Sequence, residues 1–511
     1  MIVRGDKQTI RSVGEGQRES VQRHRLPRVG RSGLILVILL LIFGKPIGVH
    51  AQSPKPLPAV ETDQTTASDE ELQKATKSIA LRGDDERLRP ESQFQTTIGR
   101  TVLTMTGAVR LDLNPQKNLD LDSTRDNDRI RLTPELKANF IFSFPHDILL
   151  FTQLGLEDKV TLRDKVKPMN VYSILFDEFF VHVPLPLSVP SAFRIGRQQF
   201  FEPRRWFLND DLDGIRLFLD PHPFHVNLSV STPVPSFDTS IRAFDDIFRS
   251  RDQVDFLIQT SYDMQPASQK SKIGGYLLIR NDDSPADADP FWVGIRSYGR
   301  PKFKFKIGKS EFMKKLFKPR LRYWLDAAFV GGTVQSQSLR GFAFDVGASY
   351  MARKFQLQPY LTLGFAYGSG DSNPNRGMNG NFRQTGFQSN TGKFGGVVNF
   401  DYYGILFDPE LSNLSIFTAG LGFRPLPKSS MDVVYHHYEQ NTRSSSLRDI
   451  DVKGDLTGTS TNVGDEIDLI VGYREIQNFR VRLRTGYFIP GSAFVQGDSA
   501  FEGRLDVLWS F

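Results

Sequence analysis

The chain ends with Phe501-Glu502-Gly503-Arg504-Leu505-Asp506-Val507-Leu508-Trp509-Ser510-Phe511. Apolar residues occupy the odd positions from 505 to 511, whereas Arg504, Asp506 and Ser510 occupy even positions. Because successive side chains of a β-strand point to opposite faces, one face of this strand suits lipid and the other carries charge. Such a strand with a terminal aromatic residue is typical of the closing strand of an outer-membrane β-barrel. The stretch therefore predicts an all-β transmembrane antiparallel barrel and, with it, transport across a membrane.

The alternation of apolar and polar residues recurs from Phe94 onward, in nineteen segments. A soluble β-sandwich also alternates, but it does not need strands of ten residues or more again and again. Because single-chain bacterial barrels have even strand counts, we expect about eighteen strands in a barrel over residues 93–511. The segments are 103–112, 129–140, 148–157, 171–183, 192–200, 212–220, 224–232, 253–263, 272–281, 290–298, 320–330, 341–351, 357–367, 394–404, 415–424, 430–438, 465–474, 479–488 and 502–511.

The connections between these segments are of two kinds. Short connections that contain proline lie at 144–147, 184–186 and 221–223. Long connections rich in Gly, Asn, Asp and Ser lie at 113–127, 233–251, 368–393 and 439–464. Bacterial barrels have short periplasmic turns and longer outer loops, so we expect the long connections to form outer loops or plugs across the pore. The strand parity leaves open whether two of them lie on the periplasmic side.

A targeting segment precedes the barrel. Basic residues between Arg23 and Arg31 are followed by the apolar run 34–43 and by Val49-His50-Ala51. An apolar run of this length spans roughly 15 Å as a helix, about half of the hydrocarbon core, so it indicates a cleaved signal peptide and not a spanning helix. We expect the signal peptide at 1–51 and a periplasmic lead-in of low order at 52–92.

The net charge of +6 comes from the targeting segment. Residues 1–51 contain nine basic and three acidic residues, which leaves 55 basic and 55 acidic residues in the rest of the chain. This balance argues against nucleic acid as a partner. The chain has no cysteine, which excludes thiolate metal clusters, thiol nucleophiles and disulfides.

A lysine-rich stretch at 301–318 is the densest cationic segment after the signal peptide. It contains Lys302, Lys304, Lys306, Lys309, Lys314, Lys315 and Lys318. Two interpretations remain open: a solvated turn near lipid head groups, or a surface that recruits an anionic chain.

Many aromatic residues lie near the ends of the expected strands. This placement is typical of the girdles that barrels form at the two membrane interfaces, although ordinary core packing is the alternative. The residues are Phe142, Phe144, Phe200, Phe201, Trp206, Tyr402, Tyr403, Tyr487 and Phe488.

Charged residues on the barrel strands carry the functional prediction. In segment 479–488, Arg480, Arg482 and Arg484 share one face. An arginine that faced lipid at the midplane would cost roughly 2 to 4 kcal/mol, so we expect all three in the lumen. The same rule assigns to the lumen the basic residues Arg131, Arg216, Arg322 and Arg504 and the acidic residues Glu135, Asp213, Asp326, Glu466, Asp468 and Asp506.

These lumenal arginines have two interpretations. Each arginine can brace the wall in an ion pair with one of the acidic residues. Together, guanidinium groups along a low-dielectric wall also lower the barrier for an anion, and their planar forks fit carboxylates well. The second interpretation predicts a pore that selects anions.

Catalysis is poorly supported by the sequence. The adjacent His436 and His437 would face opposite sides of a strand, so one metal ion cannot bind both. A Gly-x-Ser-x-Gly elbow is absent, and no carboxylate pair stands out. We therefore expect no enzyme, no metal and no cofactor. A barrel-borne enzyme or surface-binding protein, with its active group in loops 368–393 and 439–464, is the alternative of another class.

Several motifs in the chain resemble the alginate-export porin family over about residues 94–511. The group from Arg194 to Arg216 is the most specific of them. The motifs are Arg194-Ile195-Gly196-Arg197-Gln198-Gln199-Phe200, Arg204-Arg205-Trp206, Asp210-Asp211-Leu212-Asp213-Gly214-Ile215-Arg216, Tyr367-Gly368-Ser369-Gly370-Asp371, Phe382-Arg383-Gln384-Thr385-Gly386-Phe387-Gln388-Ser389-Asn390, Pro409-Glu410-Leu411-Ser412-Asn413-Leu414, Gly464-Asp465-Glu466-Ile467-Asp468-Leu469 and Pro490-Gly491.

The resemblance implies an 18-stranded monomeric barrel in the bacterial outer membrane. Such a barrel would conduct a polyanionic, uronate-type polysaccharide outward through an arginine-rich lumen, with loops gating either mouth. Arg197, Arg204 and Arg216 lie in the matching motif and are the first candidates for anion contact. The implied partners are the polysaccharide cargo, outer-membrane lipid and a periplasmic export machinery. A general or small-anion-selective porin is the alternative.

Overall fold

The computed structural model describes residues 94–164, 171–233, 253–264, 271–283, 288–301, 320–334, 337–373 and 377–511. The expected signal peptide (1–51) and lead-in (52–92) lie outside these residues, and so do the seven lysines of segment 301–318. Within the described ranges, no helix is both long enough and apolar enough to cross a bilayer.

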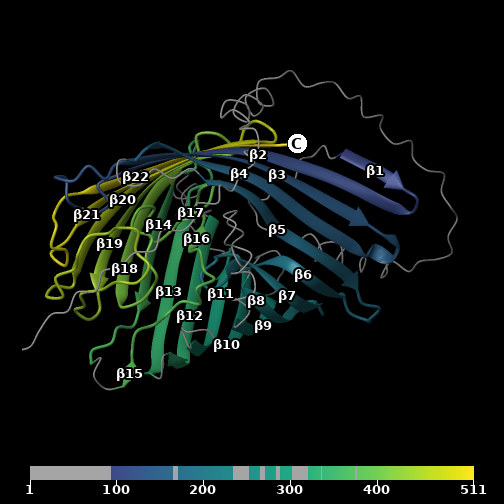
Figure 1. The fold of residues 1–511 in the computed structure, drawn as a ribbon, viewed down its shortest axis with the longest axis horizontal. Coiled ribbons are helices and arrows are strands. Elements are labelled where there is room, and N and C mark those ends of the chain that lie inside the picture. The colour runs from purple at the N-terminus through teal and green to yellow at the C-terminus, as the bar shows by residue number, and fades with distance from the viewer. Residues whose placement is uncertain are drawn as a thin grey trace, which may run out of the picture. The chain divides into compact units, whose positions relative to one another are not determined.

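The described strands form a closed antiparallel barrel of 18 strands, which runs from β2 to β14 and from β18 to β22 (Figure 1). The barrel strands are β2 (Thr101–Lys117), β3 (Arg129–Ser143), β4 (Leu149–Arg163), β5 (Val171–Pro184), β6 (Ser191–Phe201), β7 (Asn209–Leu219), β8 (Phe224–Pro233), β9 (Gln253–Met264), β10 (Ser271–Asp282), β11 (Ala288–Gly299), β12 (Arg320–Val334), β13 (Gln337–Met351), β14 (Tyr360–Gly368), β18 (Leu414–Phe423), β19 (Ser429–Gln440), β20 (Asn462–Tyr473), β21 (Phe479–Pro490) and β22 (Ala500–Ser510). The shorter elements are β1 (Phe94–Ile98), the 3-10 turn η1 (Pro145–Asp147), β15 (Met378–Asn379), β16 (Thr391–Gly392) and β17 (Phe400–Asp401).

The C-terminal strand closes the barrel, as its sequence predicts. β22 pairs antiparallel with β2. Phe511 extends this pairing, because its N–H donates to the Gly107 carbonyl at 2.9 Å and its carbonyl accepts from the Gly107 N–H at 2.8 Å. A Cβ atom at Gly107 would lie 2.4 Å from the Phe511 ring, so the glycine makes room for the terminal aromatic residue.

The strand alternation divides the side chains between lumen and outer wall. On β18 and β19, Thr418 and His436 are buried in the lumen, whereas the outward Leu421 is 67% exposed. The outward Phe365 and Phe417 rings lie 4.7 Å apart on neighbouring strands. The outer wall therefore presents apolar side chains to hydrocarbon, as a transmembrane barrel requires.

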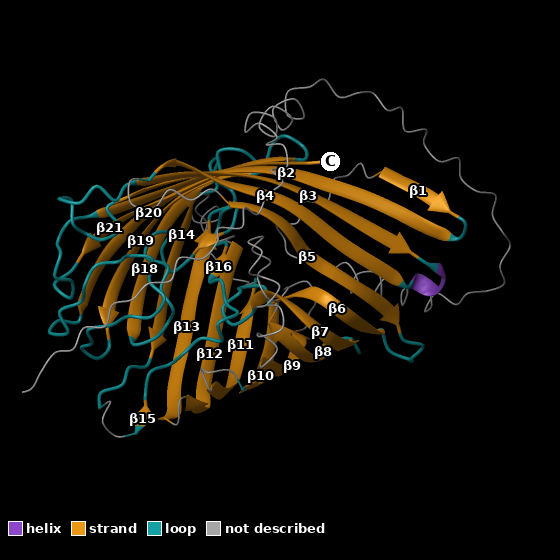
Figure 2. Cartoon of the chain, viewed as in Figure 1, coloured by secondary structure: helices purple, strands orange, loops and turns teal. Residues whose placement is uncertain are grey.

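Long and short connections lie at opposite ends of the barrel. The loop end carries the described connections 118–128, 202–208, 369–373 with 377–413, 441–461 and 491–499. The turn end carries the C-terminus and the turns 144–148, 185–190, 220–223, 352–359, 424–428 and 474–478. Figure 2 shows that strands make up nearly all the regular structure. By the rule for bacterial barrels, the turn end faces the periplasm. Three of the four expected long connections thus share the loop end, and the fourth (233–251) lies almost entirely outside the described residues.

One of the nineteen expected strands is wrong. Segment 394–404 belongs to the connection between β14 and β18, and only Phe400–Asp401 forms a strand there, paired with β16. Phe394, Val398 and Tyr402 are 3 to 4% exposed. The alternation of this segment therefore does not mark a wall strand, because both of its faces are buried inside the barrel. We call residues 381–413 the lumenal segment.

The expected aromatic girdles are only partly correct. Phe144 and Tyr487 are exposed, as an interfacial position requires. Five others are at most 3% exposed, because they are buried in the interior of the barrel. These five are Phe200, Trp206, Tyr402, Tyr403 and Phe488. Core packing, the alternative interpretation, is right for them.

Replacing Leu363 with arginine tests the outward face of β14. Leu363 is 57% exposed on the outer wall, so the arginine would meet lipid and cost roughly 2 to 4 kcal/mol if it sits near the midplane. Urea unfolding in lipid vesicles measures this change. Met378→Arg, in the loop-end strand β15, is the control and should change stability little. Equal effects at both sites would contradict the assigned faces.

Candidate functional site

Two connections fill the middle of the lumen: the lumenal segment and the β6–β7 loop (residues 202–208). Trp206 and Phe207 of this loop are at most 2% exposed. Phe207 stacks on Tyr276 of β10 with ring centroids 3.7 Å apart, and the Trp206 indole N–H donates to the Tyr403 hydroxyl at 2.8 Å. The loop and the lumenal segment thus share an aromatic core inside the barrel.

A buried ion-pair network ties the β6–β7 loop to the wall. Arg204 donates to Asp326 of β12 at 3.0 Å and also to Asp345 of β13. Arg296 of β11 lies 2.6 Å from Glu202 and 2.7 Å from Asp326. We call these five residues the crossing network. Because every charge in it has an opposite partner, it braces the loop across the lumen.

Glu466 of β20 anchors the lumenal segment. Its carboxylate is fully buried and accepts from the Leu406 N–H at 2.7 Å, the Phe407 N–H at 3.0 Å and the Tyr438 hydroxyl at 3.1 Å. Asp468, the next lumenal residue of β20, lies 3.4 Å from the His436 imidazole. Both acidic residues face the lumen as expected, and Glu466 satisfies backbone donors that would otherwise be buried without partners.

The three stacked arginines of β21 also face the lumen as expected. Arg480 donates to Asp506 at 2.9 Å, and the Arg482 guanidinium lies 3.6 Å from the same carboxylate. Arg484 donates to Asp401 of the lumenal segment at 2.8 Å. All three side chains are buried beneath that segment. In this structure they brace the wall, which is the first of the two interpretations.

Three further expected residues face the lumen in the half of the wall nearer the loop end. Arg504 donates to Glu502 at 2.8 Å. Glu135 lies 3.0 Å from Lys137. Arg131 shares the lumenal face of β3 with Glu135 and is half-buried.

Arg197 and Asp213 do not face the lumen. They lie on the outward face, with Ile195 and Ile215, each 45% exposed. Arg197 donates twice to Asp213, at 3.0 and 3.1 Å. The rule that sends charges inward fails here because the two residues neutralise each other on adjacent strands. Arg197 is therefore placed away from any anion in the pore, which corrects the expectation.

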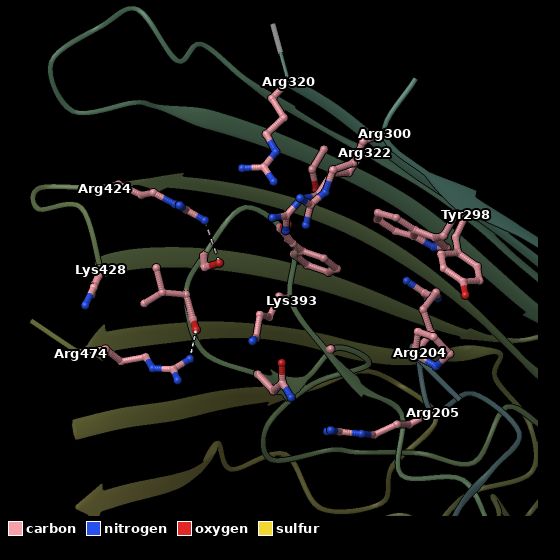
Figure 3. Close-up of a pocket in the computed structure, with 18 of the residues that line it drawn as sticks. Arg204, Arg205, Tyr298, Arg300, Arg320, Arg322, Lys393, Arg424, Lys428 and Arg474 are labelled. Atoms are coloured by element: carbon pink, nitrogen blue, oxygen red, sulfur yellow. Dashed lines mark hydrogen bonds between the residues drawn. The ribbon is translucent and has the colours of Figure 1, made fainter. Parts of the chain in front are cut away.

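A cavity in the lumen opens at the turn end and measures about 970 Å³ (Figure 3). We call it the vestibule. Glu202 is its one acidic lining residue among those described, and Arg296 pairs with it. Nine basic residues line it: Arg204, Arg205, Arg300, Arg320, Arg322, Lys393, Arg424, Lys428 and Arg474.

Three vestibule arginines hold the lumenal segment by its backbone. Arg322 donates to the Phe394 carbonyl at 2.6 Å, and Arg424 donates to the Gly395 carbonyl at 2.6 Å. Arg424 also donates to the Gly396 carbonyl at 3.1 Å, and Arg474 donates to the Val397 carbonyl at 3.5 Å (Figure 3). No described carboxylate lies within the 4.0 Å ion-pair distance of these three guanidinium groups. Neutral carbonyls fix the positions of these guanidinium groups without an ion pair, so the vestibule wall carries an excess of positive charge.

Sequence reasoning found only Arg204 and Arg322 in the vestibule. The others were missed because most lie at strand ends or in turns, where alternation carries no information. One signal was available in the chain. The turns 424–428 and 474–478, together with Arg300 and Arg320 beside the β11–β12 connection, carry basic residues at the same end of the barrel.

A smaller cavity of about 620 Å³ lies at the loop end. Arg280, Arg383, Arg448 and Glu410 are among its lining residues. Arg448 donates to Glu410 at 2.8 Å and thereby joins the loop 441–461 to the lumenal segment. Burial raises the pKa of Glu410, while Arg448 acts in the opposite direction. The aromatic core and the crossing network lie between this cavity and the vestibule.

The described part of the chain shows no grouping of three potential metal-binding side chains. His436 is buried in the lumen, and His437 faces outward, 2.8 Å from Asp465, so the predicted opposite orientation of the pair is correct.

A closed barrel with an apolar outer wall and a charged lumen defines an outer-membrane β-barrel of the porin class. The chain belongs to the alginate export family, whose model matches residues 107–507. The protein is therefore located in the bacterial outer membrane.

Among curated proteins, the chain is similar to the alginate production protein AlgE of Azotobacter vinelandii, with 25% identity over 191 residues. That match covers 33% of this chain and 40% of the relative.

Solved structures show the same fold. Acinetobacter baumannii OccAB2 has a TM-score of 0.53 at 11% identity and covers 80% of this chain and 98% of its own. Pseudomonas aeruginosa OccK2 has a TM-score of 0.52 at 12% identity, covering 80% and 97%. At these identities the likeness concerns the fold alone. The family and the fold are those of transport proteins.

Replacing Asp506 with asparagine tests whether the lumenal ion pairs stabilise the barrel. Asp506 is fully buried and compensates Arg110, Arg480 and Arg482, so the change leaves three guanidinium groups without their shared carboxylate. We expect a loss of about 3 to 5 kcal/mol in the free energy of unfolding, measured by urea titration in vesicles. Asp283→Asn, at an exposed site, is the control. A loss below about 0.5 kcal/mol for Asp506→Asn would show that the braces add no stability.

Proposed function

We propose that this protein passes an anionic, uronate-type polysaccharide across the outer membrane, as a monomer. The observation that carries this proposal is the vestibule, whose described lining contains nine basic residues and one acidic residue. Membership of the alginate export family supports the class of cargo. Residues 52–511 contain 55 basic and 55 acidic residues, so the excess of cations in the vestibule arises from where these residues lie and not from the total charge.

The vestibule lies at the turn end, which by the rule for bacterial barrels faces the periplasm. A polyanion that arrives from the cell would therefore meet this cationic surface first. A periplasmic export machinery that delivers cargo to this mouth is the corresponding partner. The direction of transport is accordingly outward.

Passage of a polymer requires the middle of the lumen to open. The crossing network and the aromatic core separate the vestibule from the cavity at the loop end. Opening would displace the β6–β7 loop, since Arg204 ties it to Asp326 and Asp345. The lumenal segment is held at Leu406 and Phe407 by Glu466, and between residues 394 and 397 by the vestibule arginines.

A small-anion porin is the second candidate. It is favoured by the buried state of Arg480, Arg482 and Arg484, which line neither the vestibule nor the cavity at the loop end and contact acidic residues or the lumenal segment. A narrow lumen would suffice for that function. Block of the current by a long uronate chain distinguishes the two candidates.

Neutralising two vestibule cations tests the proposal. The double variant Arg320→Gln and Lys428→Gln removes charge without touching the three arginines that hold the lumenal segment. In planar bilayers with a salt gradient, we expect weaker anion preference. The oligouronate concentration that halves the current should rise roughly three- to tenfold, because each cation contributes about 1 kcal/mol or less.

The matched control is Arg353→Gln with Lys354→Gln. Both residues are exposed in the turn 352–359 at the same end but do not line the vestibule. The control should keep the selectivity and the block of the unmodified protein. A pore that prefers cations and resists oligouronate would contradict the export proposal. Anion preference without block by long chains would favour the small-anion porin.

The variant Arg204→Met tests whether the β6–β7 loop closes the middle of the lumen. The change removes the ion pairs of residue 204 with Asp326 and Asp345 while keeping a side chain of similar length. We expect a larger single-channel conductance, because the loop is then free to move from the lumen. Arg163→Met, at an exposed position near the loop end, should leave the conductance unchanged. Unaltered conductance in Arg204→Met would mean that the crossing network does not limit the passage.

A further inference from the structure

A second lumenal cavity adjoins the vestibule and measures about 320 Å³. We call it the side cavity. Phe201, Glu202, Pro203 and Tyr298 line both spaces, so the β6–β7 loop stands between them. A volume near 300 Å³ is at the lower end for small-molecule sites. The side cavity therefore suits one or two sugar residues and not a long stretch of polymer.

Arg216 supplies a buried charge on the wall of the side cavity. Its side chain is 6% exposed. The guanidinium donates to the Gln199 carbonyl at 3.0 Å and weakly to the Asn227 side-chain oxygen at 3.5 Å. No carboxylate of the described chain lies within ion-pair distance of it. A buried charge without a counter-charge is unfavourable, and an anionic ligand would relieve this.

Aromatic rings fix the plane of this guanidinium. Phe200 and Phe218 lie 4.3 and 4.8 Å from it, and Arg194 continues the stack between Phe218 and Phe180, at 5.2 and 4.3 Å. The stacked faces are occupied, so only the N–H edges of Arg216 remain for a ligand. A planar fork held in one orientation matches the two oxygens of a carboxylate.

The remaining lining groups suit a sugar ring. Asn227 and Gln259 are joined by a hydrogen bond of 2.8 Å, and their amides offer further donors and acceptors for hydroxyl groups. Tyr276 and Tyr298 add aromatic surface. The acidic residues of the cavity are already engaged, Glu202 with Arg296 and Asp220 with His225. Few repulsive charges therefore oppose an anion.

We propose that the side cavity binds a single uronate residue, with its carboxylate on Arg216 and its hydroxyls on Asn227 and Gln259. This inference rests on the proposed function, since the bound uronate residue would be part of the transported polysaccharide. The side cavity is then a recognition subsite beside the path of the polymer. It recognises a single sugar ring that carries a carboxylate, whereas the vestibule attracts anionic groups whatever their arrangement.

Binding of the monosaccharide glucuronate to the full-length protein in detergent tests the subsite. Calorimetry or ligand-observed NMR would measure the affinity for glucuronate, glucose and acetate. We expect glucuronate to bind at least about tenfold more tightly than either of the others, because only it carries both the carboxylate and the hydroxyl-bearing ring.

Two variants locate the site. Arg216→Gln should weaken glucuronate binding about tenfold or more, and Gln259→Ala roughly three- to tenfold. Arg163→Gln, a matched change away from the cavity, should leave the affinity unchanged. If Arg216→Gln fails to fold, Gln259→Ala decides, because Gln259 contacts Asn227 and not the arginine stack.

Several outcomes would overturn the subsite. Glucose or acetate that binds as tightly as glucuronate would remove the uronate assignment. Unchanged glucuronate affinity in Gln259→Ala, or in a folded Arg216→Gln protein, would place the binding elsewhere. Failure of the export proposal is recognised separately, since the variant Arg320→Gln with Lys428→Gln alters selectivity and polymer block but should leave glucuronate affinity at the side cavity intact.

Discussion

Pairing of β22 with β2 is the constraint on which the rest of the structure depends. Closure gives each of the 18 described barrel strands a hydrogen-bonded neighbour on both sides, because an open sheet edge is not tolerated in hydrocarbon. It also separates the side chains into two environments, an apolar outer wall and an enclosed lumen. Charged residues of opposite sign then gather at short distance inside, as Asp506 does with Arg110, Arg480 and Arg482. Both the lumenal ion pairs and the cationic cavities follow from the closure of the barrel around its lumen.

The lumenal arginines fall into two groups with different physical roles. Those of β21 and the crossing network have carboxylate partners and rigidify the interior. Arg322, Arg424 and Arg474 instead bond to backbone carbonyls, and Arg216 is stacked between rings, so their charge is positioned but not neutralised by a described carboxylate. A guanidinium paired with a carboxylate stabilises the barrel, while one that is bonded only to neutral groups can attract a mobile anion. The proposed preference for anions therefore depends on the second group.

The sequence predicts the barrel well because alternation is a local property of each strand. Eighteen of the nineteen expected segments overlap wall strands, and His436 faces the lumen as its parity requires. The same logic fails where contacts are non-local. Segment 394–404 alternates yet packs inside, and Trp206 is buried because a distant segment covers it. The predicted lumenal position of Asp213 is wrong because Arg197, on the adjacent strand, pairs with its carboxylate on the outer face. Most vestibule residues lie outside the strand pattern, and only pairing of the whole sheet brings them together.

The turn end is unequal around its rim. The turns 144–148, 185–190 and 220–223 contain no lysine or arginine, whereas the turns at 424–428 and 474–478 contribute Arg424, Lys428 and Arg474. The polyanionic cargo proposed above would consequently be attracted toward one sector of the rim and little toward the opposite sector. Its leading end would dock off-centre against β12, β18 and β20 before it could align with the barrel axis. For such a cargo, capture and threading would be separate events that depend on different parts of the mouth.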